Sequence, residues 1–432
     1  MERTVNIDQS YSAEGDNVAV PQAGPLCPGC GSKKVVPFYE VHDAPVQSCL
    51  LLSDSEEALR FPCGTISLAL CENCGFVYNA AFDPRLVDYT RDYEEQQAFS
   101  PRFNRFAEEL TGDLINRYEL RDKTIVEIGC GKGDFLLLLC SMGNNRGVGI
   151  DPSYLPGRIT SPFLNRVTFV RDFYSDQYSD REWDFVCCRH TLEHIPDTAS
   201  FLRKVRRTMD RRPDAIAFFE VPDVGRVLQE GAFWDVYYEH CSYFTPDSLA
   251  RLFQECGFEV LNLYKGFDNQ YLMIEARPVS GSDGNGLSRN FDNLGATTSD
   301  VADFASRCRT KITTWKDTLG ELRKEGCRVA IWGSGSKCVG FLSALESQHE
   351  IECVVDINPH RHGKYLPGSG VQIVAPEFLQ QYKPHTVIVM NPIYTEEIRK
   401  HLNQMGLNPY LLSVQDPANT TMLLKTSLRN RR

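Results

Sequence analysis

Hydrophobic and polar residues alternate in blocks that predict strands and helices in turn along the middle of the chain. The predicted strands are short apolar runs at residues 124–130, 147–151, 166–172, 183–190 and 215–222. Helical periodicity is expected at residues 102–118, 135–143 and 198–209. Alternation at this spacing is typical of βαβ units, so we predict an α/β fold with a mostly parallel sheet.

A second alternating block follows a stretch dominated by Gly, Ser, Asn and Asp, which is the best candidate for a linker, at residues 278–300. The strands predicted in this block are residues 328–335, 351–357 and 385–391, with helices at 301–324 and 338–345. We therefore expect a second, smaller Rossmann-like α/β domain after the first.

These patterns divide the chain into six segments. The first is a polar tail without hydrophobic periodicity, and the second is rich in cysteine and turn residues. In chain order we predict a disordered tail, a cysteine-rich domain, the first α/β domain, the linker, the second α/β domain and a short tail, at residues 1–24, 25–88, 89–277, 278–300, 301–418 and 419–432.

Composition narrows the classes of function. A formal charge of −11 over 432 residues argues against a large nucleic-acid surface, which needs clustered Lys and Arg. The longest strongly apolar run, residues 135–140, is far too short for a membrane span, and the first residues have no secretory pattern. Sixteen cysteines without such a signal indicate metal binding and free thiols, so we expect a cytoplasmic protein.

Two pairs of cysteines have the spacing of a metal site. Cys27 and Cys30 form one C-x-x-C pair, and Cys71 and Cys74 form the other. Four thiolates can surround Zn²⁺ tetrahedrally, and such a site is structural because no position stays open for catalysis. Unrelated free thiols are the alternative interpretation.

The sequence after the first predicted strand is rich in glycine. Gly129, Gly131 and Gly133 lie in a turn that leads into a helix, so that backbone N–H groups face a ligand. Glu127 precedes the turn, and Asp151 ends the next strand, where a carboxylate can accept hydrogen bonds from ribose hydroxyls. The G-x-G-x-G pattern suits S-adenosylmethionine better than a dinucleotide.

Three more polar residues follow later strands of the same predicted sheet. Asp172 could contact an adenine amino group, or it could be a turn residue or helix cap. His190 and His194 lie at the carboxyl end of the fourth strand, where ligands of open α/β sheets bind. An equal alternative for His194 is a structural role at the start of a helix.

Residues 236–244 concentrate titratable groups among aromatic residues. His240 can act as a general base, and Glu239 can orient an imidazole or accept the proton itself. Tyr237 can donate a hydrogen bond to an oxyanion that develops as the proton leaves. A hydrogen-bonded core network is the alternative, but the cofactor loop in the same domain favours proton transfer.

A second glycine-rich turn begins the later block, at residues 332–340. Gly333, Gly335 and Lys337 resemble a phosphate-binding turn, with Lys364 nearby in the sequence. The alternative is a packing turn that binds no ligand, because no complete G-x-G-x-x-G is present.

The ordered set of motifs resembles the nucleotide-sugar C-methyltransferases of deoxysugar biosynthesis. The motifs are the paired cysteines, E-x-G-x-G-x-G, H-I-P-D, Y-x-E-H-x-x-Y-F and a C-terminal G-x-x-x-K with Y-L-P-G, and they span residues 26–415. The resemblance implies a class I methyltransferase core and a small N-terminal zinc-binding domain. It also implies a C-terminal Rossmann-like domain that closes over a nucleotide-linked keto sugar.

The resemblance implies roles for individual residues. His240 would remove the proton next to a sugar ketone, and Tyr237 and Glu239 would assist. Tyr93 would lie over the site. The residues expected to hold S-adenosylmethionine are Glu127, Gly129, Gly131, Gly133, Asp151, Asp172 and His190, and those expected to contact substrate are His194, Lys337 and Lys364.

Two departures from the family pattern affect the substrate. His190 stands where the family often has Asn, and Tyr238 stands where it commonly has His. Both side chains are expected to line the substrate pocket, so the accepted ketone could differ from a deoxysugar.

Two other classes of function stay open. An O- or N-methyltransferase of another small metabolite would need less base chemistry, so that a His240 variant would keep substantial turnover. A binding protein could also retain the fold without the chemistry, although the intact glycine loop and His240 argue against it.

Overall fold

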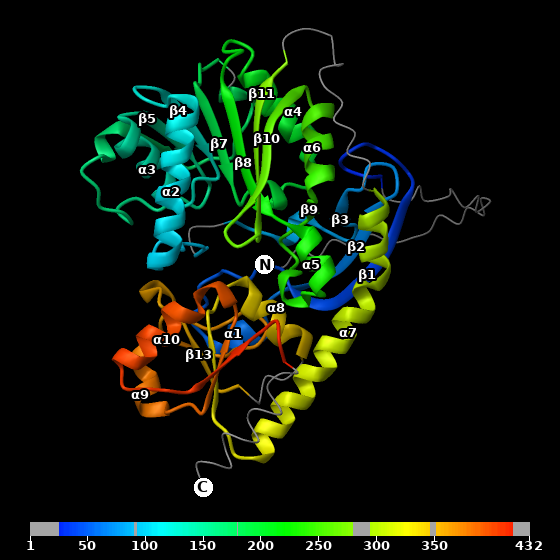
Figure 1. Cartoon of the computed structure of the whole chain (residues 1–432), viewed down its shortest axis with the longest axis vertical. Helices are drawn as coiled ribbons and strands as arrows, with labels where there is room; N and C mark the ends of the chain where they lie inside the picture. The colour runs from blue at the N-terminus through cyan, green and yellow to red at the C-terminus, as the bar shows by residue number, and fades with distance from the viewer. Residues whose placement is uncertain (1–25, 90–92, 179, 280–293, 346–350, 418–432) are drawn as a thin grey trace, which may run out of the picture.

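The structure is a computed structural model that describes residues 26–89, 93–178, 180–279, 294–345 and 351–417. Within this part of the chain the strands form sheets of four, seven and five strands. The seven-stranded sheet lies in the upper half of the molecule and the five-stranded sheet in the lower half, with the four-stranded sheet beside them (Figure 1). The predicted tails at residues 1–24 and 419–432 lie outside the described residues.

The seven-stranded sheet contains all five strands predicted for the first α/β block. Its spatial order is β10-β11-β8-β7-β4-β5-β6, parallel from β8 to β6, and β11 runs antiparallel to both its neighbours. This Rossmann-like order with an antiparallel edge confirms the predicted class I methyltransferase fold. The strands are β4 (Thr124–Ile128), β5 (Arg146–Ile150), β6 (Val167–Val170), β7 (Phe185–Arg189), β8 (Ile216–Pro222), β10 (Phe258–Gly266) and β11 (Tyr271–Pro278).

The order of the strands leaves a crevice for a ligand at one edge of the seven-stranded sheet. The chain passes from β4 to β5 and β6 on one side and then returns to β7 and β8 on the other side. The loops that follow β4 and β7 therefore diverge and leave a crevice at the carboxyl ends of these strands.

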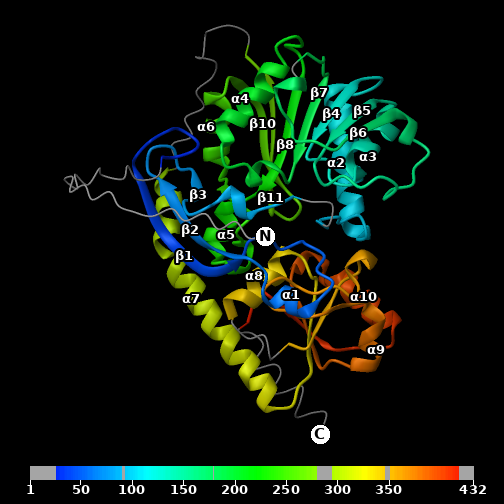
Figure 2. The ribbon, with the colours of Figure 1, turned by 180° about the vertical axis from the view of Figure 1, so that it is seen from behind.

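Helices cover both faces of this sheet, α2 and α3 on one face and α4 and α6 on the other (Figures 1 and 2). Phe185 of β7 packs with the α2 and α3 side, whereas its neighbour Val186 packs with the α4 and α6 side. Strands covered on both faces are continuously apolar, as residues 185–188 are. The helices have the bounds Pro101–Tyr118, Asp134–Gly143, Thr198–Thr208 and Pro246–Glu255.

The four-stranded sheet combines two distant parts of the chain. Three strands come from the predicted cysteine-rich domain, and the fourth, β9, comes from residues 242–243. The pairing of β3 with β9 therefore ties the segment 236–244 to this sheet. Its antiparallel strands are β1 (Val35–Pro45), β2 (Cys63–Cys71), β3 (Val77–Asn79) and β9 (Ser242–Tyr243), with the short helices α1 (Ser55–Leu59) and α5 (Val224–Glu230) nearby in sequence.

The five-stranded sheet is parallel and repeats the switch in strand order. Its order is β14-β13-β12-β15-β16, so the chain leaves β12 in one direction and returns on the other side. The strands are β12 (Val329–Trp332), β13 (Cys353–Val355), β14 (Ile373–Val374), β15 (Thr386–Val389) and β16 (Tyr410–Ser413), and the helices are α8 (Ser336–Leu345), α9 (Leu379–Tyr382) and α10 (Thr395–Gln404).

A long helix, α7 (Leu294–Lys324), runs along one side of the molecule from the four-stranded sheet to the C-terminal domain (Figures 1 and 2). It begins at Leu294, before the predicted residue 301, so the last part of the predicted linker is helical. Residues 280–293 of the predicted linker lie outside the described residues. None of the helices in the described ranges combines the length and apolar character needed to cross a bilayer.

Candidate functional site

A cavity of about 810 Å³ lies where the carboxyl ends of the seven-stranded and five-stranded sheets face each other. Gly129 and Asp151 line it from the ends of β4 and β5. Gly333 and Asp356 line it from the ends of β12 and β13. The two predicted glycine-rich turns therefore border one shared space.

The first glycine-rich turn, residues 129–133, leads from β4 into α3 and has a backbone that only glycine tolerates well. Gly129 and Gly131 have φ angles of 68° and 53°. A Cβ atom would lie 2.0 Å from Oγ1 of Thr191 at Gly129 and 2.5 Å from Oε1 of Glu95 at Gly131. The absence of side chains leaves the backbone accessible to a ligand at the start of a helix.

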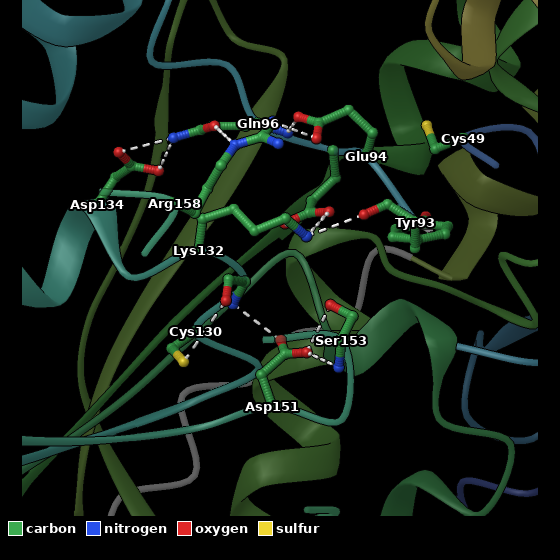
Figure 3. Close-up of polar contacts among 12 residues, drawn as sticks. Cys49, Tyr93, Glu94, Gln96, Cys130, Lys132, Asp134, Asp151, Ser153 and Arg158 are labelled. Atoms are coloured by element: carbon green, nitrogen blue, oxygen red, sulfur yellow. Dashed lines mark hydrogen bonds and ion pairs between the residues drawn. The ribbon is translucent and has the colours of Figure 1, made fainter. Parts of the chain in front are cut away.

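Asp151 holds this turn in shape. Its Oδ2 accepts a hydrogen bond from the backbone N–H of Gly131 at 2.8 Å (Figure 3). Its Oδ1 accepts from the N–H and the hydroxyl of Ser153, both at 2.7 Å. A carboxylate has further lone pairs, so Asp151 can still accept a hydrogen bond from a ligand hydroxyl.

Glu127 is the other carboxylate predicted at this turn, and one of its two oxygens lacks a hydrogen-bond partner among the described residues. Glu127 is 3% exposed, and the oxygen without a partner is Oε2. Burial raises the pKa of Glu127 to about 8. An ammonium group entering the cavity would stabilise the carboxylate, which fits the amino group of an amino-acid-bearing cofactor.

Asp172 lies at the edge of the cavity and takes part in a local turn. It accepts hydrogen bonds from the hydroxyl of Tyr178 at 2.9 Å and from the N–H of Phe173 at 2.8 Å. The bond from Tyr178 leads the interactions that lower its pKa. Both predicted roles, turn residue and adenine contact, are compatible with this position.

His190 has a left-handed backbone, with φ of 49°, and lines the cavity. Its Nε2 lies 2.8 Å from Oε1 of Glu220, which also binds Arg189. Burial alone would lower the pKa of His190, but Glu220 and Glu193 outweigh it and raise the pKa to about 9. His190 therefore carries a positive charge at neutral pH.

His240 and Tyr237 line the same cavity, with ring centroids 4.3 Å apart. Burial, followed by the charges of His194, His190 and Lys337, lowers the pKa of His240 well below its usual value. Burial raises the pKa of Tyr237. At neutral pH the cavity therefore contains a neutral imidazole, which can accept a proton, beside a neutral phenol, which can donate a hydrogen bond.

The carboxylate of Glu239 has partners that the sequence did not suggest. Its Oε1 accepts hydrogen bonds from the N–H of Ser48, at 3.1 Å, and from the Ser48 hydroxyl. Its Oε2 accepts from the hydroxyl of Tyr93 at 2.9 Å. Among the described residues this carboxylate has no hydrogen bond to an imidazole. No motif marks Ser48, so sequence analysis missed it.

Glu239 does orient a histidine, but through its backbone. Its carbonyl oxygen lies 3.0 Å from Nδ1 of His194, and Tyr89 contacts the same nitrogen at 2.7 Å. A carbonyl can only accept, so Nδ1 of His194 carries a proton. The rings of His194 and His240 are 4.8 Å apart, which brings two of the predicted histidines together.

The two lysines predicted to contact substrate differ in position. Lys337 lines the cavity and forms an ion pair with Asp235, which also pairs with Arg226 at 2.5 Å. Lys364 donates to the Ser53 hydroxyl at 2.8 Å and does not line the cavity. The neighbouring Tyr365 forms a bridge with Leu52, so Lys364 lies beside the insert between the two cysteine pairs, and its contact with substrate stays a prediction.

The four predicted cysteine ligands converge at one end of the four-stranded sheet. The Sγ atoms of Cys27 and Cys74 are 3.6 Å apart and those of Cys30 and Cys71 are 3.7 Å apart. All four Sγ atoms lie within 4.8 Å of one another. Four sulfurs around a zinc ion at about 2.3 Å would have similar separations.

Two family models match this chain. One, described as a methyltransferase domain, matches residues 103–263, and the other, described as a C-methyltransferase C-terminal domain, matches residues 290–408. The chain thus contains a methyltransferase domain followed by a C-methyltransferase C-terminal domain.

This methyltransferase is similar to known enzymes at low identity. C-methyltransferase NovU of Streptomyces niveus is 25% identical over 268 residues, which cover 60% of this chain and 60% of NovU. Ubiquinone biosynthesis O-methyltransferase of Pseudomonas aeruginosa is 25% identical over 169 residues, 35% of this chain and 70% of that protein. A solved SAM dependent methyltransferase from Aquifex aeolicus has 14% identity over 42% of this chain and 96% of that chain, with a TM-score of 0.33, which carries no functional inference.

Tyr238 of the methyltransferase does not line the cavity, which corrects the prediction from the family pattern. It is 1% exposed, and its ring lies 5.4 Å from that of Phe82. Its hydroxyl accepts from the N–H of Asp83 at 2.8 Å. A Cβ atom on Gly64 would lie 2.4 Å from the Tyr238 ring, so this side chain fills the space above β2.

We expect Gly64→Ala to lower the free energy of unfolding by about 1–3 kcal/mol, because the added methyl group overpacks the Tyr238 ring. Gly320→Ala in α7 is the matched control, since a Cβ there meets no atom within 4 Å, and alanine favours a helix by about 1 kcal/mol. Urea denaturation of both variants measures the difference. Equal stability of the two variants would contradict this packing of Tyr238.

Proposed function

We propose that this methyltransferase transfers a methyl group from S-adenosylmethionine to a carbon atom next to a ketone. The observation that carries the proposal is the neutral, buried His240 beside Tyr237 in the same cavity as the glycine turn. Oxygen and nitrogen acceptors need less help from a base, whereas a C–H bond must be deprotonated before carbon can attack a methyl group. The match to a C-methyltransferase C-terminal domain supports the same chemistry.

S-adenosylmethionine would be held by the residues of the first turn. Glu127 would receive its amino group, the backbone of residues 129–133 would approach the amino-acid portion, and Asp151 would accept bonds from the ribose. Asp172 and His190 would border the remainder of the cofactor. When bound, this cofactor supplies a methyl group on a positively charged sulfur that is open to attack by carbon.

His240 would take the proton from the substrate carbon, and the Tyr237 hydroxyl would donate a hydrogen bond to the oxygen on which negative charge develops. His194 would contact substrate beside His240. Glu239 and Tyr93 would hold this group of side chains in place. A positioned base typically contributes about 10²–10⁴ to the rate.

We propose a nucleotide-linked keto sugar as the substrate class. The C-terminal turn with Gly333, Gly335 and Lys337 borders the cavity opposite the cofactor turn, which suits a substrate with a phosphate-bearing portion. The Ser334 N–H and hydroxyl both donate to Asp356, at 2.9 and 2.6 Å, as Gly131 does to Asp151 in the first turn. The resemblance to the deoxysugar C-methyltransferases favours the same class.

We expect His240→Asn to lower kcat by about 10²-fold or more, because the variant cannot accept the proton. The methyl group is located by NMR after incubation with ¹³C-labelled S-adenosylmethionine and a panel of nucleotide-linked keto sugars. The matched control is His42→Asn, at an exposed histidine in β1, which should keep full turnover. Label on oxygen or nitrogen would overturn C-methylation and favour the chemistry of the O-methyltransferase relative.

The pH profile should reveal the lowered pKa of His240. A base must be deprotonated to work, and a lower pKa keeps His240 deprotonated as the pH falls through about 6.5, the ordinary histidine value. We therefore expect kcat/KM to stay level from about pH 7.5 to pH 6.5 and to fall only at lower pH. Half-loss of kcat/KM at pH 6.5 or above would contradict this environment of His240.

We also propose that the four-cysteine cluster holds one structural zinc ion. Cys74→Ser should abolish stoichiometric zinc in the purified protein and lower its melting temperature, since three thiolates bind zinc less tightly. Cys63→Ser, at an exposed cysteine of the same sheet, is the control and should keep the metal. Elemental analysis of both variants gives the answer, and zinc retained by Cys74→Ser would contradict the site.

A further inference from the structure

Lys132 lies inside the first glycine-rich turn, residues 129–133, and it borders the cavity together with Tyr93 and Glu95. The side chain is fully buried, and its Nζ donates a hydrogen bond to the backbone carbonyl oxygen of Tyr93 at 2.9 Å (Figure 3). Oε2 of Glu95 is 3.1 Å away. Burial of an ammonium group is costly unless it is paired and hydrogen-bonded, so this arrangement demands an explanation.

Tyr93 connects this lysine to the segment that bears the base. The Tyr93 hydroxyl donates to Glu239 at 2.9 Å, and Glu239 directly precedes His240. Tyr93 therefore accepts a hydrogen bond at its carbonyl from Lys132 of the first glycine-rich turn. Its hydroxyl donates a hydrogen bond to Glu239 of the segment 236–244. Both the glycine-rich turn and His240 line the cavity, so in the proposed reaction Tyr93 would connect the segment that holds the methyl donor to the segment that bears the base.

Other ties hold the residues after Tyr93, which we call the strap, residues 94–97. Glu94 forms an ion pair with Arg158 and accepts from the side chain of Asn358 at 2.9 Å. Gln96 donates to Asp134 at 2.8 Å (Figure 3). These bonds fix the strap between the two large sheets, but none of them reaches the carbonyl of Tyr93.

We propose that Lys132 is a positioning residue for methyl transfer: by holding the carbonyl of Tyr93 it aims the Tyr93 hydroxyl at Glu239. The first glycine-rich turn and the segment 236–244 are thereby kept at a constant distance from each other. The proposal rests on the proposed function for its effect on rate, but the contact itself does not. A simpler role for Lys132, neutralising Glu95, would involve neither Tyr93 nor Glu239.

A double-mutant cycle separates these two roles. Lys132→Met and Tyr93→Phe should each lower kcat about tenfold, because small misplacements of reacting groups are costly. The double variant should be no worse than Tyr93→Phe within about twofold, since Lys132 acts through the hydroxyl that is already missing. Multiplicative losses, about a hundredfold in the double variant, would overturn the proposal.

A second double variant, Lys132→Met/Glu95→Gln, removes both charges of the ion pair. It therefore tests whether Lys132→Met loses activity only because the carboxylate of Glu95 is left unpaired and the protein misfolds. Under the proposal its kcat stays as low as that of Lys132→Met. Recovery of kcat in this variant would overturn the proposal in favour of simple charge neutralisation. Binding of S-adenosylhomocysteine by calorimetry should change less than about threefold in Lys132→Met, and a tenfold loss would make Lys132 a cofactor ligand instead.

Hydrogen exchange tests the contact without any turnover. With S-adenosylhomocysteine bound, the amides of residues 93–97 should exchange at least about fivefold faster in Lys132→Met than in the unaltered protein. Unchanged exchange would overturn the proposal even if methyl transfer is established. Faster exchange in a protein that fails to methylate carbon would support the contact while the proposed function fails.

Discussion

The arrangement of the site depends on the buried carboxylate of Glu239. It is 1% exposed and receives its hydrogen bonds from Ser48 and Tyr93, which precede it by 191 and 146 residues. A buried carboxylate without donors costs several kcal/mol, on the order of 3–5 when one partner of a buried pair is lost. Ser48, Tyr93 and the segment 236–244 must therefore assemble together. The backbone carbonyl of Glu239 keeps a proton on Nδ1 of His194.

The charged neighbours of His190 and His240 shift the pKa values of these two cavity histidines in opposite directions. Glu220 and Glu193 hold His190 as a cation, with a pKa of about 9. For His240, burial together with positive neighbours lowers the pKa, although a carboxylate oxygen of Glu193 lies within 4.8 Å of one of its ring nitrogens. Neighbouring groups whose pKa values are driven apart are typical of proton-transfer sites.

The two glycine-rich turns, residues 129–133 and 332–340, share the same arrangement of hydrogen-bond donor and carboxylate. In each, a donor at the turn binds a carboxylate at the end of the next strand, Gly131 to Asp151 and Ser334 to Asp356. Each turn lies at the switch point of a parallel sheet, where loops diverge and leave room for a ligand. Because the two switch points face each other, the two turns enclose one cavity instead of two separate clefts.

Much of the fold could be predicted because it follows from local patterns. Buried strands such as residues 185–188 need continuous apolar residues, and the cofactor turn needs glycine where φ is positive. The cysteine pairs needed only their spacing. The hairpin of β10 and β11 escaped prediction because β10 is half-buried along most of its length and has a weak pattern.

By itself, the sequence determined the alternation of strands and helices in the two α/β blocks, the class I fold, the first glycine-rich turn and the identity of the cysteines that meet. Only the tertiary structure decided where side chains point. It directed Tyr238 into the packing above β2, turned Lys364 toward Ser53, and brought Ser48 to Glu239. Secondary structure reflects neighbours a few residues apart, whereas the direction of a buried polar or aromatic group depends on partners hundreds of residues away.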